Sequence, residues 1–320
     1  MSKERDPQLD YLKGIFILLM VSFHLALVEH TYPTLREAVY TFHMSAFLVI
    51  SGYLANVHKR PAAFGLSMMR LLVPYCIFEA AYIIMQHLLG SSLGAHNAID
   101  QLSTTDFIVR IATMPTGPYW YIHTLLICTV VYWLIFKVLA MRGAGAMALM
   151  GLILYGLSCV IEGLSWSNVI YFLIGAFIRD VGLAFSSMIK PSLWTVLPLA
   201  VLFAFPENFV SGSLPGVIIT VLVISLLQAV YPHVGASARH CLCYLGRNSL
   251  AIVIFSPIFT IATKPAVPLF SFDPTAVCFW ITALVFIVAC CLLCAHVSDK
   301  LSISRFLFLK RDFYTPFKQV

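Results

Sequence analysis

The sequence predicts an all-α fold, a polytopic membrane bundle of about ten transmembrane helices, with residues 1–320 forming a single domain. Hydrophobic residues make up 60% of the chain and charged residues only 11%, against roughly 25% charged residues in ordinary soluble domains. The mean hydropathy is +0.91. Apolar runs of about 17 to 23 residues recur along the chain, which is the length that a helix needs to cross a bilayer.

Ten apolar runs are the predicted helices, and nine or eleven helices also fit because the sixth, seventh and ninth runs are short or weakly bounded. The ten runs cover residues 11–29, 39–56, 67–89, 119–140, 145–162, 167–184, 193–207, 214–232, 248–264 and 277–297. The first run is longer than the apolar region of a typical signal peptide and no cleavage pattern follows it, so we expect it to be retained. The loop at 90–118 contains DFIVRIATM, an amphipathic segment that we expect to lie at the membrane interface.

The positions of Lys and Arg predict the orientation. With the N-terminus in the cytoplasm, only Arg36, Arg110 and Lys264 fall on the outer side, and the other 17 of the 20 Lys and Arg residues fall inside. Inner loops of membrane proteins carry such an excess of positive charge. We therefore expect a protein of the cell (inner) membrane with both termini cytoplasmic. The net charge of +6 reflects this topology, so we expect no nucleic-acid partner.

Lys13 and His24 lie inside the first apolar run, where placing an ionisable side chain in the membrane costs free energy. The 11-residue step places them roughly 16 Å apart along a helix, about half a bilayer. Lys13 would lie near the inner face and His24 in the outer half. This placement predicts one continuous cavity that takes one reactant from each side of the membrane.

The same topology brings other polar residues to these two depths. His43 and His123 would join His24 in the outer half, and the short 30–38 connection would make the first two helices neighbours. Arg70 and Arg247 would join Lys13 at the inner face, while Glu79 would lie near mid-membrane.

Each of these residues also has a structural interpretation. The cations would serve as snorkelling anchors, and the His side chains and a protonated Glu79 as hydrogen-bonding groups between helices. Trp120 would belong to an interfacial aromatic belt, and Ser51–Gly52 would be a small-residue packing patch.

The nine Cys residues form no disulfide framework, and Cys291 and Cys294, the only C-x-x-C pair, have no second pair or His at ligand spacing. No Gly-rich nucleotide-binding motif or internal repeat is present. We therefore expect no metal and no prosthetic group.

Several motifs resemble those of the acyltransferase 3 family of integral-membrane acyltransferases, most closely the branch related to fucose acetylases. They are Leu9-Asp10-Tyr11-Leu12-Lys13-Gly14-Ile15 followed by His24, Phe42-His43-Met44-Ser45-Ala46-Phe47 ending in Ser51-Gly52-Tyr53, Arg70 with Pro74, Gly117-Pro118-Tyr119-Trp120-Tyr121-Ile122, and Leu245-Gly246-Arg247-Asn248-Ser249-Leu250. Their order and spacing cover nearly the whole chain. The chain departs from the pattern at Ser45, which replaces a Pro, and at Val253 and Ser256, where relatives often carry Tyr and His.

The resemblance implies transfer of an acetyl (acyl) group from cytoplasmic acetyl-CoA (acyl-CoA) to a sugar hydroxyl of a cell-envelope glycan or its lipid-linked precursor. His24 would act as general base or accept the acyl group transiently, His43 would orient it, and Glu79 would position the donor or relay a proton. The residues expected to bind substrate or acyl-CoA are Lys13, Asp10, Arg70, Ser51, Gly52, Trp120, His123 and Arg247.

Two other functions fit the composition. A transporter or flippase would line a solute path with the same polar residues, although transporters usually carry internal repeats. A catalytically degenerate relative would keep the fold as a membrane scaffold.

Overall fold

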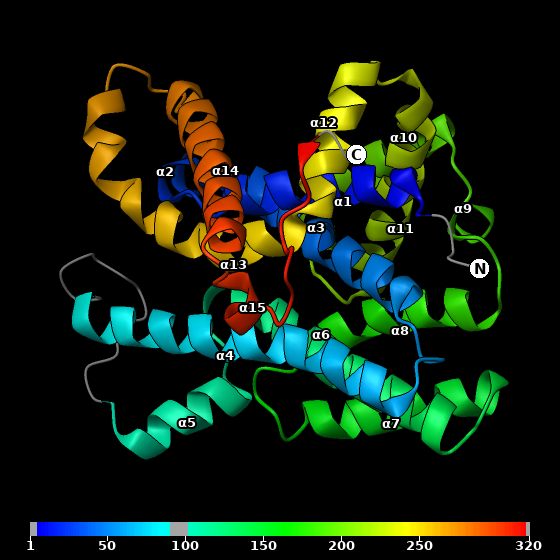
Figure 1. Ribbon diagram of the computed structural model, residues 1–320. Coiled ribbons are helices and arrows are strands. Elements are labelled where there is room, and N and C mark those ends of the chain that lie inside the picture. The colour runs from blue at the N-terminus through cyan, green and yellow to red at the C-terminus, as the bar shows by residue number, and fades with distance from the viewer. Residues whose placement is uncertain (1–4, 90–101, 318–320) are drawn as a thin grey trace.

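The computed structural model describes residues 5–89 and 102–317, a range that contains helices and no strand (Figure 1). In chain order the elements are α1 (Pro7–Phe23), α2 (Ala26–Thr31), α3 (Pro33–Leu54), α4 (Pro61–Leu89), α5 (Thr104–Thr113), η1 (Gly117–Tyr119), α6 (Trp120–Trp133), η2 (Leu134–Val138), α7 (Gly143–Ser158), α8 (Trp166–Asp180), α9 (Phe185–Met188), η3 (Leu193–Thr195), α10 (Val196–Phe203), η4 (Pro206–Asn208), α11 (Leu214–Val230), η5 (Tyr231–His233), α12 (Ala236–Arg247), α13 (Ser249–Ala262), η6 (Lys264–Phe270), α14 (Val277–Lys300) and α15 (Ser304–Leu307). The all-α prediction is confirmed for this range.

Two helix pairs at the centre approach at backbone distance, α1 with α12 and α3 with α8. A Cβ added to Gly246 of α12 would lie 1.8 Å from the Asp10 carbonyl oxygen of α1, and one added to Gly14 would lie 2.0 Å from the Leu242 carbonyl oxygen. In the second pair, a Cβ on Gly52 would lie 2.2 Å from the Phe172 carbonyl oxygen. Small residues allow this packing in membrane helices, so the structure gives Gly52 the packing role that the sequence offered as one of two interpretations.

α1 and α3 are neighbours, as the short connection between them predicts. α2 links them, the Phe16 ring contacts the rings of Phe42 and Phe47, and the Tyr40 hydroxyl donates a hydrogen bond of 2.9 Å to the Phe23 carbonyl. α1 begins after Asp6, whose carboxylate accepts from the Gln8 amide, and has Pro7 in its first turn, both typical of helix starts. The outcome is an antiparallel α1–α3 pair at the centre of the molecule.

The helix predicted at 248–264 begins at a sharp break. α12 and α13 meet at Asn248 with a bend of 78°. The Asn248 amide holds the C-terminal segment across this break, since its Nδ2 donates to the Thr315 carbonyl and its Oδ1 accepts from the Thr315 amide. In Figure 1 this segment runs between α12 and α15. The break therefore leaves a helix end, rather than a continuous span, beside α1.

Four helices are long and apolar enough to cross a membrane: Pro61–Leu88, Gly117–Val138, Leu214–His233 and Val277–Lys300. The bent pair α12–α13 would make a fifth. All ten predicted runs overlap helices, but several of these helices are short: α8 has 15 residues and α10 has eight. The chain is thus a membrane protein with four or five candidate spans in the described range, and ten crossings remain a prediction.

The amphipathic segment in the long loop forms α5. Ser103 caps it, accepting a hydrogen bond of 3.1 Å from the Asp106 amide. None of the residues of α5 is buried. The amphipathic segment is thus helical, while its position at the interface remains a prediction; residues 90–101 of the same loop lie outside the described part.

Candidate functional site

At the N-terminal end of α1, one buried carboxylate gathers three cations. Asp10 accepts from Arg5 at 2.6 Å, pairs with Lys13 at 2.8 Å and pairs with Arg247 of α12 at 3.2 Å. The Asp10 side chain is only 3% exposed, so the burial of a charge is offset by these partners. We call these four residues the Asp10 cluster. Its net charge is positive, and Asp10 itself would position cations rather than bind an anion.

A cavity of about 560 Å³ opens beside this cluster. We call it the Lys13 cavity; it is lined by Arg5, Asp6, Leu9, Asp10, Lys13, Tyr53, Leu54, Asn56 and Arg179. Three of these residues are Lys or Arg and come from α1, α8 and the chain before α1. Its size falls within the roughly 300–1,000 Å³ of small-molecule sites. Asp6 and Asp10 also line the cavity, so its lining keeps a net positive charge of one, which favours an anionic ligand.

A second group of cations adjoins the first. Burial lowers the pKa of Lys310, and the charges of Arg70, Lys59 and Arg5 add to this effect. Burial and the neighbouring Arg70 likewise lower the pKa of Lys59. The Arg70 Nε donates to the Leu309 carbonyl at 3.1 Å. Arg70 does not line the Lys13 cavity. It contacts the C-terminal segment instead and extends the positive region in that direction.

At the other end of α1, His24 follows the last helical residue. Its Nδ1 lies 2.7 Å from the Met20 carbonyl oxygen. Because a carbonyl can only accept, Nδ1 must carry the hydrogen, which leaves Nε2 as the basic nitrogen. His43 repeats the arrangement, with its Nδ1 2.7 Å from the Val39 carbonyl oxygen and its Nε2 buried without a hydrogen-bond partner in the described range.

His24 lines two cavities. The first, the Tyr40 cavity, has a volume of about 160 Å³ and is lined by His24, Tyr40, His43, Met44, Ser45, Trp120, Asn168 and Ser211. The Tyr40 ring packs near both imidazoles, 5.8 Å from His24 and 5.2 Å from His43 between ring centroids. The expectation that His24 and His43 come together is met, and Trp120 lies with them.

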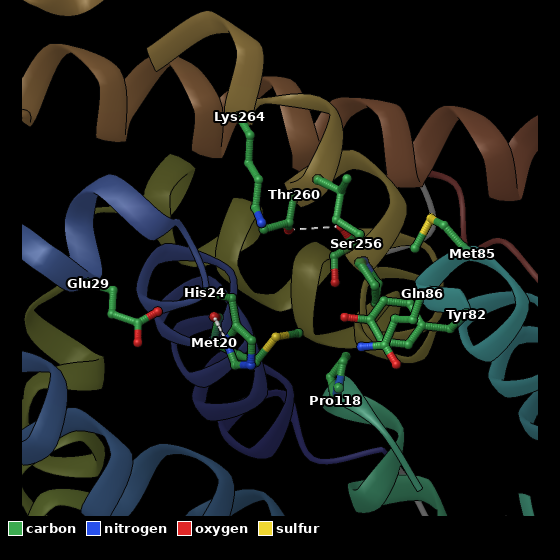
Figure 2. Close-up of a pocket in the computed structure, with 13 residues that line it drawn as sticks. Met20, His24, Glu29, Tyr82, Met85, Gln86, Pro118, Ser256, Thr260 and Lys264 are labelled. Carbon is green, nitrogen blue, oxygen red and sulfur yellow. Dashed lines mark hydrogen bonds between the residues drawn. The ribbon is translucent and has the colours of Figure 1, made fainter. Parts of the chain in front are cut away.

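The second, the Lys264 cavity, has a volume of about 200 Å³ and lies between α1, α4, η1 and α13. Figure 2 shows His24 across this cavity from Tyr82 and Gln86, with Lys264 and Thr260 above. His24 therefore lines both cavities.

An aromatic layer lies between the two ends of α1. The Phe47 ring contacts the Phe16 ring at 6.3 Å and the Tyr121 ring at 5.7 Å, between centroids. The Tyr121 hydroxyl is 2.7 Å from the Ser51 hydroxyl. The Lys13 cavity shares no lining residue with either cavity at His24. The expectation of one continuous cavity is thus wrong for this conformation, because large rings fill the middle of the α1–α3 pair.

Glu79 holds the turn before η1 in place through Thr116. Its Oε1 accepts from both the amide and the hydroxyl of Thr116, each at 2.7 Å, while Oε2 is buried without a partner in the described range. Glu79 itself lines neither cavity at His24. It holds the turn that begins η1, whose Gly117 and Pro118 line the Lys264 cavity. Gly117 has a φ of +55°, a conformation that favours glycine.

His123 is the sequence-predicted residue that the structure separates from the others. Its Nε2 donates to the Ala112 carbonyl of α5 at 2.9 Å, and its ring lies 5.8 Å from that of Tyr75. It lines neither cavity at His24. This geometry matches the structural interpretation, a hydrogen bond between helices.

Sequence reasoning missed several residues around His24. Tyr40 precedes His43 by three residues and so shares its helix face, a signal that the sequence does contain. The linings also contain Asn168, Ser211 and Gln86, which come from distant segments of the chain. No sequence motif marked these residues as part of a site. Ser256, noted as a departure from the family pattern, lines the Lys264 cavity.

Comparisons with known proteins place these observations in context. A family model described as an acyltransferase domain matches residues 6–296. The match includes both ends of α1, both His24 cavities and the α12–α13 break. A search of the curated proteins and a search of the solved structures gave no significant match.

Proposed function

This chain belongs to the acyltransferase 3 family of membrane acyltransferases, and we propose on that basis that it transfers an acetyl or other acyl group from acyl-CoA to a sugar hydroxyl of a cell-envelope glycan or its lipid-linked precursor. The observation that carries the proposal is the placement of His24. His24, whose Nδ1 is held by the Met20 carbonyl, lines two cavities, and a third cavity lined by Arg5, Lys13 and Arg179 lies at the opposite end of the same helix.

The donor would bind at the Lys13 end. Acyl-CoA carries several phosphate groups, and Lys13, Arg5 and Arg179 would provide charge-assisted hydrogen bonds to them, while Arg247, which does not line this cavity, pairs with Asp10. With the orientation that the Lys and Arg positions predict, this cavity faces the cytoplasm, where acyl-CoA is made. Asp10 would hold the cations in place.

The acyl group would then travel along α1. The roughly 16 Å rise between Lys13 and His24 would be spanned by the extended pantetheine arm of acyl-CoA. For the thioester to reach His24, the rings of Phe16, Phe47 and Tyr121 must part.

At His24 the chemistry would be general-base catalysis. Nε2 takes the proton of the acceptor hydroxyl as the hydroxyl oxygen attacks the thioester carbonyl carbon. The carbon–sulfur bond breaks, and the departing CoA thiolate takes the proton back from the imidazolium. His43 and Tyr40, which line the same cavity, would orient the reactants. We favour this direct transfer over an acyl-histidine intermediate.

Lys13→Gln separates donor binding from chemistry. Loss of a cation in the Lys13 cavity should raise the KM for acetyl-CoA by about tenfold or more, the value of a charge-assisted hydrogen bond, and leave kcat nearly unchanged. Steady-state kinetics of the purified protein would measure both. Arg60→Gln is the control, because Arg60 is exposed before α4 and lines neither the Lys13 cavity nor those at His24. A Lys13 variant with an unchanged KM would contradict the donor site.

The function is tested most simply in cells. Mass spectrometry of surface glycans from cells with and without the protein should show an acetyl mass that is lost with the protein. Unchanged glycans would argue against the proposed acceptor class.

A further inference from the structure

The Lys264 cavity contains polar groups that the mechanism above does not use. Ser256 and Thr260 of α13 and Tyr82 and Gln86 of α4 line it together with Lys264, and His24 faces them (Figure 2). Gln86 Oε1 is buried and has no hydrogen-bond partner among the residues that the structure describes. Because an unpaired buried acceptor is costly, a ligand hydroxyl that donates to this oxygen would be stabilised.

The charge in this cavity is unbalanced. Glu29, the acidic residue of the lining, pairs with Arg36 at 2.9 Å. Lys264 is half-buried, and within residues 5–89 and 102–317 its ammonium group has no ion pair or hydrogen bond. The lining therefore presents an uncompensated positive charge in a cavity that His24 also lines.

The size of the cavity limits its occupant. At about 200 Å³ it is smaller than the roughly 300–1,000 Å³ of typical drug-sized sites, and much smaller than the Lys13 cavity of about 560 Å³. It would hold one sugar ring but not the nucleotide portion of a coenzyme. The hydroxyl and amide groups of the lining match the hydroxyls of a sugar.

From these observations we infer that the Lys264 cavity is the acceptor subsite and that it selects an acidic sugar, one that carries a carboxylate or a phosphate. Lys264 binds the negative group, Gln86 accepts from a ring hydroxyl, and the hydroxyl to be acylated faces His24. The inference rests on the proposed acyl transfer and names the class of acceptor for it.

The test uses acetyl transfer by the purified protein to three soluble acceptors: methyl glucoside, methyl glucuronoside and glucose 6-phosphate. The first two differ only at carbon 6, where the glucuronoside carries a carboxylate. We expect kcat/KM to be about tenfold or more higher for at least one acidic acceptor than for methyl glucoside, and the preference to weaken at high salt. The better acidic acceptor distinguishes a carboxylate from a phosphate.

Lys264→Gln should raise the KM for the preferred acidic acceptor by about tenfold and leave kcat, the KM for acetyl-CoA and the use of methyl glucoside unchanged. Lys264→Arg should keep most of the preference. Lys137→Gln is the matched control, since Lys137 is exposed in η2 and absent from the lining of both His24 cavities.

Equal use of the neutral and acidic acceptors, or an equal effect of Lys264→Gln on all three, would overturn the acidic-sugar inference while acetyl transfer itself stands. Transfer to none of the three, with acetyl-CoA left unconsumed, would instead overturn both the inference and the proposed function.

Discussion

His24→Ala is expected to lower acetyl transfer by about 10²–10⁴-fold, the usual contribution of a general base. The side chain follows the last residue of α1, and its hydrogen bond to the Met20 carbonyl lies within the same turn, so its loss should leave the bundle folded. The readout is glycan acetylation in cells, normalised to the amount of protein in the membrane.

The matched control for this variant is His30→Ala. His30 is exposed in α2, six residues beyond His24, and lines neither cavity at His24. The His30→Ala variant should acetylate glycan at the wild-type rate. An alanine variant at His24 that reaches the membrane in normal amount and acetylates at the wild-type rate would contradict the assignment of the base.

Gly246→Ala is expected to have the largest effect on stability. The new Cβ would lie 1.8 Å from the Asp10 carbonyl oxygen and 3.0 Å from the Gly14 amide, both backbone atoms that cannot rotate away. Relief requires α12 to move away from α1, and overpacking of this kind typically costs about 1–3 kcal/mol or more. The melting temperature in detergent should fall by several degrees.

Gly145→Ala in α7 is the control, because no atom lies within 4 Å of its added Cβ. Alanine is favoured over glycine in a helix by about 0.5–1 kcal/mol, so this variant should be as stable as the wild type or slightly more stable. If the two variants melt at the same temperature, the close α1–α12 contact is not as described.

The sequence anticipated the parts of the site that depend on helix order and charge. The short 30–38 connection predicted the meeting of His24 and His43, which now line one cavity. The positions of Lys and Arg in the sequence predicted that Arg36 and Lys264 fall on the outer side with His24. Both lie at the His24 end of α1, where Arg36 pairs with Glu29 and Lys264 lines a cavity. The length of a connection and the distribution of Lys and Arg can both be read from the sequence without knowledge of tertiary packing.

Other parts depend on contacts that have no sequence signal. Asp10 and Arg247 are 237 residues apart and meet only because α12 packs on α1. His123 is held by a backbone carbonyl, which any residue supplies. The aromatic layer of Phe16, Phe47 and Tyr121 replaced the expected continuous cavity, because hydrophobicity alone does not show which rings turn inward between two polar ends.

The central claim is that an acyl group bound as acyl-CoA at the Lys13 end of α1 is delivered to an acceptor at His24. The most direct measurement is the fate of acetyl-CoA labelled in its acetyl group, incubated with the purified protein in liposomes and an envelope glycan. We predict labelled O-acetyl ester on the sugar with release of one CoA per acetyl group transferred. Movement of the glycan or its lipid-linked precursor across the membrane with acetyl-CoA left intact would contradict this account and would identify a transporter.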